Sequence, residues 1–341
     1  MKTRNQRLNH EERCTNAGHY FVLVIRKSVV ALLLATIIPG YAWVTPAGGA
    51  SQHAHPRIIS LAPNLTEVLF ELGAGEELVG VTRFCTYPPA AQKKEKIGDF
   101  INPNLEKIVA LKPDLILAER WPSSKIVPRL RQIGLNVIET TSPKSVAGIY
   151  QLIDEVGTAI GKRDRAQTLI KGMRQRIRAI EARGKSFPRR PLLYIEIDPP
   201  SWTVGRNSFI NEAVFICGAR NIFDDSERPA LQVSREVVAE RNPEIIVSFD
   251  TAASEIRSRP GWSQIKAIRE GNIIDGLNRN LLTHGNHRLV EGMEELQRRL
   301  EKMVTGTGHR SSVIGQQSSV TIHLFRAFLL RQSRHLMADE Y

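Results

Sequence analysis

Short apolar runs alternate with amphipathic segments from Arg57 onward. RIISLAP predicts a buried strand, and NLTEVLFELGAG predicts a helix that Asn64 caps and Gly73 ends. LVGVT, residues 78–82, predicts the next strand. Because strands that alternate with helices usually build a parallel sheet covered on both faces, this pattern predicts an α/β lobe.

The same alternation continues through the first part of the chain. Helices are expected at 103–111 and 124–133, and strands at 115–118 and 136–139. These elements, together with those before them, predict an N-terminal lobe over residues 57–144.

Helical periodicity then runs without a strand for about forty residues from Ser145. Gly161 and the capping-type Asp164 divide this segment, and the second helix is expected over 164–183. A helix of about twenty residues is roughly 30 Å long, enough to bridge two lobes. Residues 145–187 are therefore predicted to be a helical linker that contains a long backbone helix.

Strand–helix alternation resumes after FPRRP. LLYIEI, EIIVSF and NIID predict strands, while FINEAVFICGA and the ranges 262–270 and 289–303 predict helices. A second, C-terminal lobe is expected over 188–303.

The two lobes carry two matching segments. NLEKIVALKPDLIL resembles SREVVAERNPEIIV, and TEVLFELGA resembles NEAVFICGA. The first match aligns Pro113 with Pro243, Glu106 with Glu236, and Asp114 with Glu244. The second match aligns Glu67 with Glu212 and Gly73 with Gly218.

The matches follow in the same order with different offsets, as duplication followed by changes in loop length would produce. Chance similarity between amphipathic segments is the alternative for either match alone. We predict an α/β fold with two similar lobes, mostly parallel sheets, a single long backbone helix joining them, and a ligand cleft between the lobes.

Composition narrows the class of function. The 341 residues are 42% hydrophobic, enough for two modest domains, and the formal charge of +12 raises nucleic-acid binding as a function. The lobes have no dense basic run, and aromatic residues are sparse and not interleaved with Lys and Arg. Nucleic-acid binding is therefore disfavoured.

The N-terminus predicts export. Arg26 and Lys27 precede an uncharged apolar run at 29–38, which is shorter than the about 20 residues that span a bilayer. The small-residue stretch PAGGA, 46–50, is typical of a signal-peptidase site. Residues 1–50 are predicted to be a signal peptide or leader of a periplasmic protein, with an uncleaved membrane anchor as the alternative.

Cysteine usage excludes a disulfide-built scaffold, because only Cys85 and Cys217 follow the leader. A bridge between them is neither required nor excluded. No Cys follows the apolar run directly, which disfavours a lipoprotein anchor. The tail at 304–341 is expected to be either disordered or an added amphipathic helix.

Binding is favoured over catalysis. No nucleophile–base motif, phosphate loop or dense metal-ligand spacing is present in the sequence, so we do not expect an enzyme or an intrinsic cofactor. Aromatic residues follow or neighbour predicted strand ends, where open α/β sheets bind ligands: Tyr87, Phe100, Trp121 and Trp202. Together they favour a large, flat, partly apolar ligand, although each alone would suit an ordinary loop anchor.

A family resemblance becomes specific on several motifs: RIISLAPNLTEVLFELGAGEELVGVT, CTYPP, NLEKIVALKPDLILAE, the long helix and QVSREVVAERNPEIIV. The chain resembles the helical-backbone (class III) substrate-binding proteins of ABC importers, above all the cobalamin receptors. The family also includes receptors for iron-siderophore complexes and haem. The resemblance implies a monomer that delivers cobalamin or a related corrinoid to an ABC permease dimer with its ATPase.

The resemblance also implies roles for particular residues. Glu106 and Glu236 match the acids that dock each lobe on permease arginines, and Tyr87 matches a tyrosine that touches the corrin. Phe100 stands where cobalamin receptors have Trp, Trp202 lies beside the aromatic residue of the second lobe, and Trp121 is only near a family Trp. Further candidate ligand contacts are Asn278, Asn280 and His284.

One departure from the family pattern is THGNHRLVEG, before the last predicted helix. His284 and His287 are candidate ligands for iron or cobalt, since neutral imidazole is a frequent metal ligand. The alternative is a helix-start loop capped by Asn286. Cys85 is likewise either a thiolate ligand or a small packed residue.

Three alternatives stay open. An iron-siderophore or haem receptor is the nearest, with Arg83, Arg206 and Arg279 available for a siderophore. An enzyme of the related metal-cluster-binding lobed proteins would need more Cys and His residues than the chain offers. A membrane-anchored sensory or structural domain would follow if the leader stays uncleaved.

Overall fold

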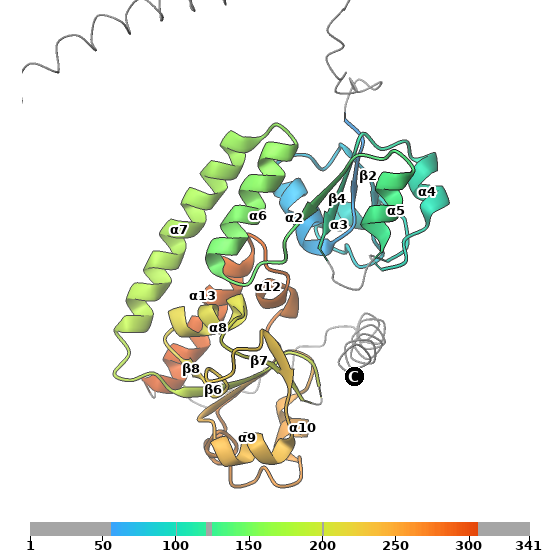
Figure 1. Ribbon diagram of the computed structural model, residues 1–341. Coiled ribbons are helices and arrows are strands. Elements are labelled where there is room, and N and C mark those ends of the chain that lie inside the picture. Colours follow the sequence, from blue (N-terminus) through green and yellow to red (C-terminus); the bar gives the residue numbers. More distant parts are fainter. Residues whose placement is uncertain (1–55, 100, 121–124, 200, 306–341) are drawn as a thin grey trace, which may run out of the picture. The chain divides into compact units, whose positions relative to one another are not determined.

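A computed structural model describes residues 56–99, 101–120, 125–199 and 201–305 (Figure 1). The predicted leader, Phe100, Trp121 and residues 306–341 lie outside the described residues.

The N-terminal sheet has five parallel strands in the order β3-β2-β1-β4-β5. The strands are β1 (Ile58–Ser60), β2 (Leu78–Val81), β3 (Glu95–Lys96), β4 (Leu115–Glu119) and β5 (Val137–Thr140). The helices between them are α2 (Pro63–Glu71), α3 (Pro89–Gln92), α4 (Leu105–Ala110) and α5 (Ile126–Gln132). Successive residues of β1 point to opposite faces of the sheet and so pack in different hydrophobic cores. Ile58 packs with α2, while Ile59 packs with α4 and α5.

The C-terminal sheet has four parallel strands in the order β11-β10-β6-β8. They are β6 (Leu192–Glu196), β8 (Arg220–Asn221), β10 (Ile245–Ser248) and β11 (Ile273–Ile274). The accompanying helices are α8 (Phe209–Ile216), α9 (Arg235–Arg241), α10 (Ala253–Arg257), α11 (Lys266–Glu270), α12 (Arg279–Thr283) and α13 (Leu289–Val304). A separate antiparallel ribbon pairs β7 (Trp202–Val204) with β9 (Ala230–Gln232).

The two sheets repeat one arrangement. The strand order β2-β1-β4-β5 corresponds to β8-β6-β10-β11. Before the matched prolines, Lys112 and Asn242 have left-handed φ values of 44° and 42°. Asp114 accepts a hydrogen bond from the Arg57 amide at 2.8 Å, as Glu244 does from the Leu192 amide at 3.1 Å. The duplication suggested by the sequence therefore extends to backbone conformation and to side-chain contacts.

The linker contains two helices, α6 (Val146–Ala159) and α7 (Arg163–Lys185), close to the predicted bounds. Ser145 caps α6 by accepting from the Gly148 amide, and Gly161 separates the helices with a φ of +68°. α7 packs against α6, α8 and α13 (Figure 1). One hydrophobic core contains residues from both sheets and from these helices, so the lobes share a continuous interior.

Three local predictions need correction. Asn64 does not cap α2, because Pro63 occupies the first helical turn and Ala62 is the capping residue. The helix expected at 262–270 is only α11, because Trp262 is buried in the preceding turn, where its indole donates to the Arg235 carbonyl. Trp202 begins strand β7 and does not lie in a loop.

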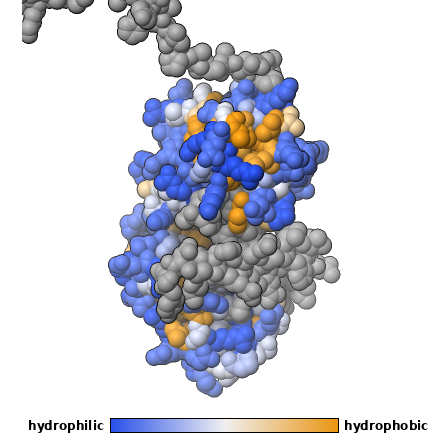
Figure 2. All heavy atoms as spheres, turned by 45° about the vertical axis from the view of Figure 1, so that its right-hand side comes forward, coloured by the Kyte–Doolittle hydropathy of each residue, from blue (hydrophilic) through white to orange (hydrophobic). Residues whose placement is uncertain are grey.

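The surface is mainly hydrophilic on the face shown in Figure 2, with one larger and one smaller group of hydrophobic residues. Large hydrophobic side chains exposed in the described ranges are Tyr87, Val109, Ile133, Leu192 and Phe215. In those same ranges, no helix has the length and hydropathy needed to cross a membrane.

Close packing of α7 gives a stability prediction. A Cβ at Gly184 would lie 2.5 Å from the Ile216 carbonyl oxygen and 2.8 Å from the Gly218 nitrogen. We expect Gly184→Ala to lower the free energy of unfolding by about 1–3 kcal/mol, because backbone would have to move. Gly172→Ala in the same helix meets no atom within 4 Å and should raise it by up to about 1 kcal/mol.

Urea unfolding of the two alanine variants measures both effects. Equal stability of the two variants would show that α7 does not depend on this close approach.

Candidate functional site

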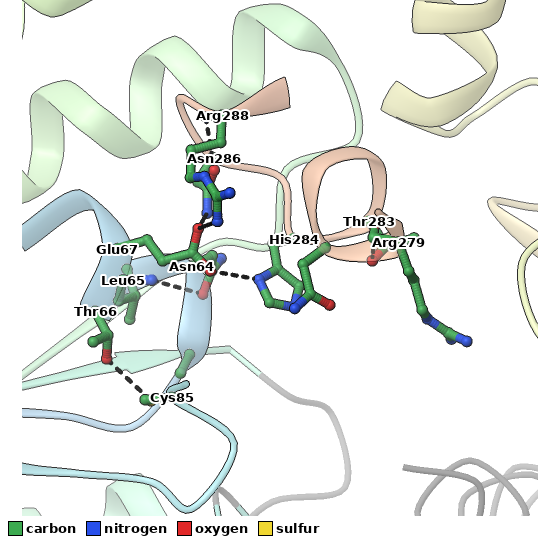
Figure 3. Close-up of polar contacts among 12 residues, drawn as sticks. Asn64, Leu65, Thr66, Glu67, Cys85, Arg279, Thr283, His284, Asn286 and Arg288 are labelled. Carbon is green, nitrogen blue, oxygen red and sulfur yellow. Dashed lines mark hydrogen bonds and ion pairs between the residues drawn. The ribbon is translucent and has the colours of Figure 1, made fainter. Parts of the chain in front are cut away.

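A buried carboxylate on α2 joins parts of the chain that are more than 200 positions apart. Glu67 is 2% exposed. Its Oε1 lies 2.7 Å from Nδ1 of His284, and its Oε2 accepts hydrogen bonds from Asn286 Nδ2 at 2.9 Å and Arg288 Nη1 at 3.2 Å (Figure 3). Glu67 thereby binds α2 to the turn between α12 and α13.

The charge state of Glu67 follows from these partners. Burial opposes ionisation, but hydrogen bonds with His284 and Asn286 and the nearby charge of Arg288 hold the pKa of Glu67 below its ordinary value. The Arg288 side chain is only 8% exposed, so each buried charge has the other as a partner. Asn286 also accepts from the Arg288 amide at 2.9 Å. It does not cap α13 as the sequence suggested, because Arg288 occupies the capping position and no side chain caps the helix there.

Glu212, which the sequence repeat aligns with Glu67, makes a similar contact in the C-terminal lobe. Glu212 on α8 accepts a hydrogen bond from the Val146 amide at 2.7 Å, at the first residue of α6. Each of these glutamates therefore binds the segment that begins a helix packed on α7. The sequence alignment paired the two residues, and that pairing was the signal from which a common role could have been inferred.

Tyr87 is connected to this cluster through Arg288. The guanidinium carbon lies 3.5 Å from the centre of the Tyr87 ring, while 41% of the tyrosine is exposed. One side of the ring therefore contacts a charge that Glu67 neutralises. The remaining exposed area is available to a flat ligand.

The two histidines differ in their surroundings. His284 uses Nδ1 toward Glu67, and its side chain is 13% exposed. His287 has Nε2 3.5 Å from Glu71 Oε2, and its Nδ1 is buried with no hydrogen-bond partner. Burial is the main cause that lowers the pKa of His287 to about 4, so this imidazole is neutral at neutral pH.

Cys85 has the surroundings of a packed thiol. Its Sγ lies 3.1 Å from Thr66 Oγ1 and 3.1 Å from Thr82 Oγ1, and burial raises the pKa of the thiol. Cys217 is fully buried in the core, and both cysteines are free. In the described part of the chain, no group of three or more His, Cys, Asp or Glu residues is placed to hold a metal ion.

Glu119, at the end of β4, is a residue that the sequence analysis missed. Burial raises the pKa of its carboxyl group, against hydrogen bonds with Ser142 and Asn64. Glu119 therefore adds a polar group beside the cluster, in a strand that the hydrophobic pattern marks only as buried.

The candidate ligand contacts in the C-terminal lobe lie at or near the first residue of a strand or helix. Trp202 is partly buried, and its amide donates to the Asp198 carbonyl at 2.9 Å. Asn278 caps α12 by accepting from the Asn280 amide at 3.1 Å. Asn280 is the second residue of α12, and His284 follows the last residue of this helix.

The three arginines considered for a siderophore have partners within the chain. Arg83 pairs with Asp99 at 3.0 Å, Arg206 donates to the Asp224 carbonyl at 2.8 Å, and Arg279 pairs with Asp250. A siderophore would have to compete with these contacts, which disfavours that alternative.

The two candidate docking acids have matching local structure. Glu106 and Glu236 are both exposed and are both the second residue of their helix, α4 or α9. Asn104 and Ser234 cap these helices by accepting from the third helical amide. A hydrogen bond from Ser234 is the main cause that lowers the pKa of Glu236, which is therefore a carboxylate at neutral pH.

A cavity of about 360 Å³ lies next to α9. Its lining includes Phe223, Leu231, Ser234, Val237 and Arg241, and none of the predicted ligand contacts. We assign it no part in ligand binding.

The sequence profile of the periplasmic binding protein family matches residues 58–279, more than half of the chain. The chain belongs to this family. Its α/β fold, with two mostly parallel sheets joined by a long helix, is that of the class III periplasmic binding proteins, as the sequence predicted.

Several relatives of this periplasmic binding protein have been named or solved. An uncharacterized ABC transporter substrate-binding lipoprotein, YvrC of Bacillus subtilis (strain 168), is 34% identical over 248 residues, which cover 70% of this chain and 78% of YvrC. The solved vitamin B12-binding protein BtuF of Vibrio cholerae is 28% identical with a TM-score of 0.63, covering 72% of this chain and 97% of BtuF.

The apo form of the haem-binding protein RhuT from Roseiflexus sp. RS-1 has a TM-score of 0.66 at 24% identity, covering 73% of this chain and 99% of RhuT. At this identity the likeness shows the shared fold alone.

The Glu67 cluster gives a stability prediction for this periplasmic binding protein. Glu67→Ala leaves Arg288 buried without its main counter-charge, so we expect the free energy of unfolding to fall by about 3 kcal/mol or more. Glu71→Ala is the control on the same helix. Its side chain is 49% exposed, and its removal should change stability by no more than about 0.5 kcal/mol.

Chemical denaturation at neutral pH measures this difference. A Glu67→Ala protein as stable as Glu71→Ala would mean that the buried carboxylate does not hold α2 to the turn before α13.

Proposed function

We propose that this protein is the substrate-binding component of an ABC importer and that it captures cobalamin or a related corrinoid. The observation that carries the proposal is the Tyr87 ring, which rests on Arg288 while much of it stays exposed. Tyr87 is the residue for which the resemblance to cobalamin receptors implies contact with the corrin. Family membership and the 28% identity to the vitamin B12-binding protein of Vibrio cholerae support the same ligand class.

Recognition of such a ligand needs flat apolar contacts with a few polar groups between them. Tyr87 and Trp202 offer aromatic surface, and Asn278, Asn280 and His284 offer polar groups. Phe100 and Trp121, outside the described residues, remain candidates from the sequence. Binding alone, with no chemical step, is the activity we assign to these residues.

Haem is the second candidate ligand within the same family. His284 favours it, because imidazole binds iron as well as cobalt. An iron-siderophore complex fits less well, since Arg83, Arg206 and Arg279 already have partners in the chain.

Delivery to the permease is assigned to Glu106 and Glu236. Each is an exposed acid in the first turn of a capped helix, and the two helices occupy corresponding places in the repeated lobes. One acid on each like lobe suits a partner built from two like subunits, and Arg residues on that partner would form charge-assisted hydrogen bonds with them. Residues 1–50 would direct export to the periplasm, where such a complex forms.

The ligand is identified by calorimetric titration with cyanocobalamin, cobinamide, haem and ferric siderophores. We expect binding of a corrinoid, weakened by at least several-fold in Tyr87→Ala because the flat contact is lost. Tyr87→Phe keeps the ring on Arg288 and serves as the matched control. Corrinoid affinity that is unchanged in Tyr87→Ala, or absent in the unmodified protein, contradicts the corrinoid proposal.

The docking acids are tested by uptake of the identified ligand into cells. The Glu106→Ala, Glu236→Ala double variant should transport at least about tenfold less, since two charge-assisted contacts are lost, with ligand affinity unchanged. Glu240→Ala removes another exposed acid of α9 and should transport normally. Normal uptake by the double variant would refute the docking role.

A further inference from the structure

Two aspartates share one arginine where strands of the C-terminal sheet end. Nη1 of Arg279 pairs with Asp250 and lies 3.5 Å from Oδ1 of Asp198. Resting on the proposed function, we propose that Asp198 and Asp250 determine specificity: they favour chelates whose edge carries neutral amides and disfavour chelates that carry carboxylates. Arg279 is the positioning residue that holds both carboxylates.

The sheet places the two acids side by side. β6 and β10 are parallel neighbours, and Glu196 and Ser248 are their last paired residues. Asp198 and Asp250 each follow two residues later, so the same register brings them to the same edge. Because this edge lies at the carboxyl ends of parallel strands, it is where an open α/β sheet binds a ligand.

The charged residues adjoin candidate ligand contacts. The Ile197 amide donates to the Trp202 carbonyl and the Trp202 amide donates to the Asp198 carbonyl, both at 2.9 Å, so Trp202 lies across from Asp198. Arg279 stands between Asn278 and Asn280 at the start of α12. Figure 3 shows its side chain pointing away from Glu67, so this charge cluster is separate from the one that holds α2.

The balance of charge at this edge is negative. Below it, Arg259 donates to both oxygens of Glu196 at 2.7 and 2.8 Å, and this buried pair neutralises itself. At the edge two carboxylates share one guanidinium. The side chains of Asp198 and Asp250 are only 8% and 18% exposed, so water and salt screen their charges less than they would on an open surface.

The acid after a third strand adds to this negative charge. Asp275 directly follows β11, and its carboxylate accepts from the Ala253 amide at 2.8 Å. Arg299 donates to the Asp275 carbonyl oxygen, but its charge is matched by Glu295 at 2.7 Å. An aspartate thus follows each of the strands β6, β10 and β11.

A negative edge distinguishes ligands by the groups at their periphery. Carboxylates accept hydrogen bonds from amide N–H groups and repel other carboxylates. Arg279 is a cation that could bind a carboxylate of the ligand, but Asp198 and Asp250 already engage it. A corrin carries amide side chains, whereas haem carries propionates. This edge therefore favours a corrinoid over haem.

Two corrinoids with the same metal and different edges test the inference. Dicyanocobinamide carries amides where dicyanocobyrinic acid carries carboxylates, and cyanide fills both axial positions of cobalt in each. Calorimetric titration of the full-length protein at neutral pH should show at least about tenfold tighter binding of the amide form. Added salt should reduce this ratio, because it screens the repulsion between carboxylates.

Substitutions that preserve side-chain size assign the preference to the two aspartates. The Asp198→Asn, Asp250→Asn double variant releases Arg279, so it should bind dicyanocobyrinic acid at least about tenfold more tightly than the unmodified protein and dicyanocobinamide more weakly. Arg279→Gln removes the cation and should shift the ratio the opposite way. Glu255→Gln changes an exposed acid of α10 and is the matched control, with a ratio within about twofold of the unmodified protein.

The outcomes separate this inference from the proposed function. If the unmodified protein binds both corrinoids equally, or if the double variant keeps the preference, the role of the aspartates is refuted while corrinoid binding stands. If the protein binds neither corrinoid, the proposed function fails together with the inference. Circular dichroism checks folding. Should the double variant not fold, Asp250→Asn alone must show a smaller shift in the same direction, and an unchanged ratio in that variant also refutes the inference.

Discussion

One buried negative charge holds together parts of this protein that are far apart in the sequence. The carboxylate of Glu67 is nearly inaccessible to water, and an isolated charge there would be strongly destabilising. It is stable because His284, Asn286 and Arg288 approach it from the turn before α13. The same contacts that satisfy the charge hold the ring of His284 and place Arg288 against Tyr87. Stability and the ligand contact proposed for Tyr87 therefore depend on one group of hydrogen bonds.

This cluster lies within a stiff frame. α7 contacts α6, α8 and α13, and one hydrophobic core contains residues from both sheets. Glu212 repeats the role of Glu67 at the start of α6. A hinge motion would have to disturb a packed core, the buried contacts of Glu67 and the partly buried contact of Glu212, whereas hinges usually act through a few loop residues. Such a frame opposes a large hinge motion between the lobes.

Much of the fold could be predicted from the sequence because its signals are local. Apolar runs marked β1, β2, β4 and β5 in one sheet and β6, β10 and β11 in the other, and helical periodicity placed α7 within two residues at each end. The two-residue strands β3 and β8 were missed, because their residues are polar or charged. The ribbon β7–β9 was missed, since its three-residue strands are too short to show alternation. Trp262 was misplaced in a helix, because an apolar residue buried in a turn has the same pattern as one on a helix face.

The sequence by itself determined the duplication, the α/β class, the long helix and the matched acids Glu106 and Glu236, since each is encoded within a few turns of chain. The sequence repeat also aligned Glu67 with Glu212, but it indicated no role for either residue. Only the tertiary structure decided what Glu67 does, because its partners follow more than 200 residues later and its charge state depends on burial. The difference between His284 and His287 has the same origin, because the fold brings a buried carboxylate to within 2.7 Å of His284 and buries Nδ1 of His287 without a hydrogen-bond partner.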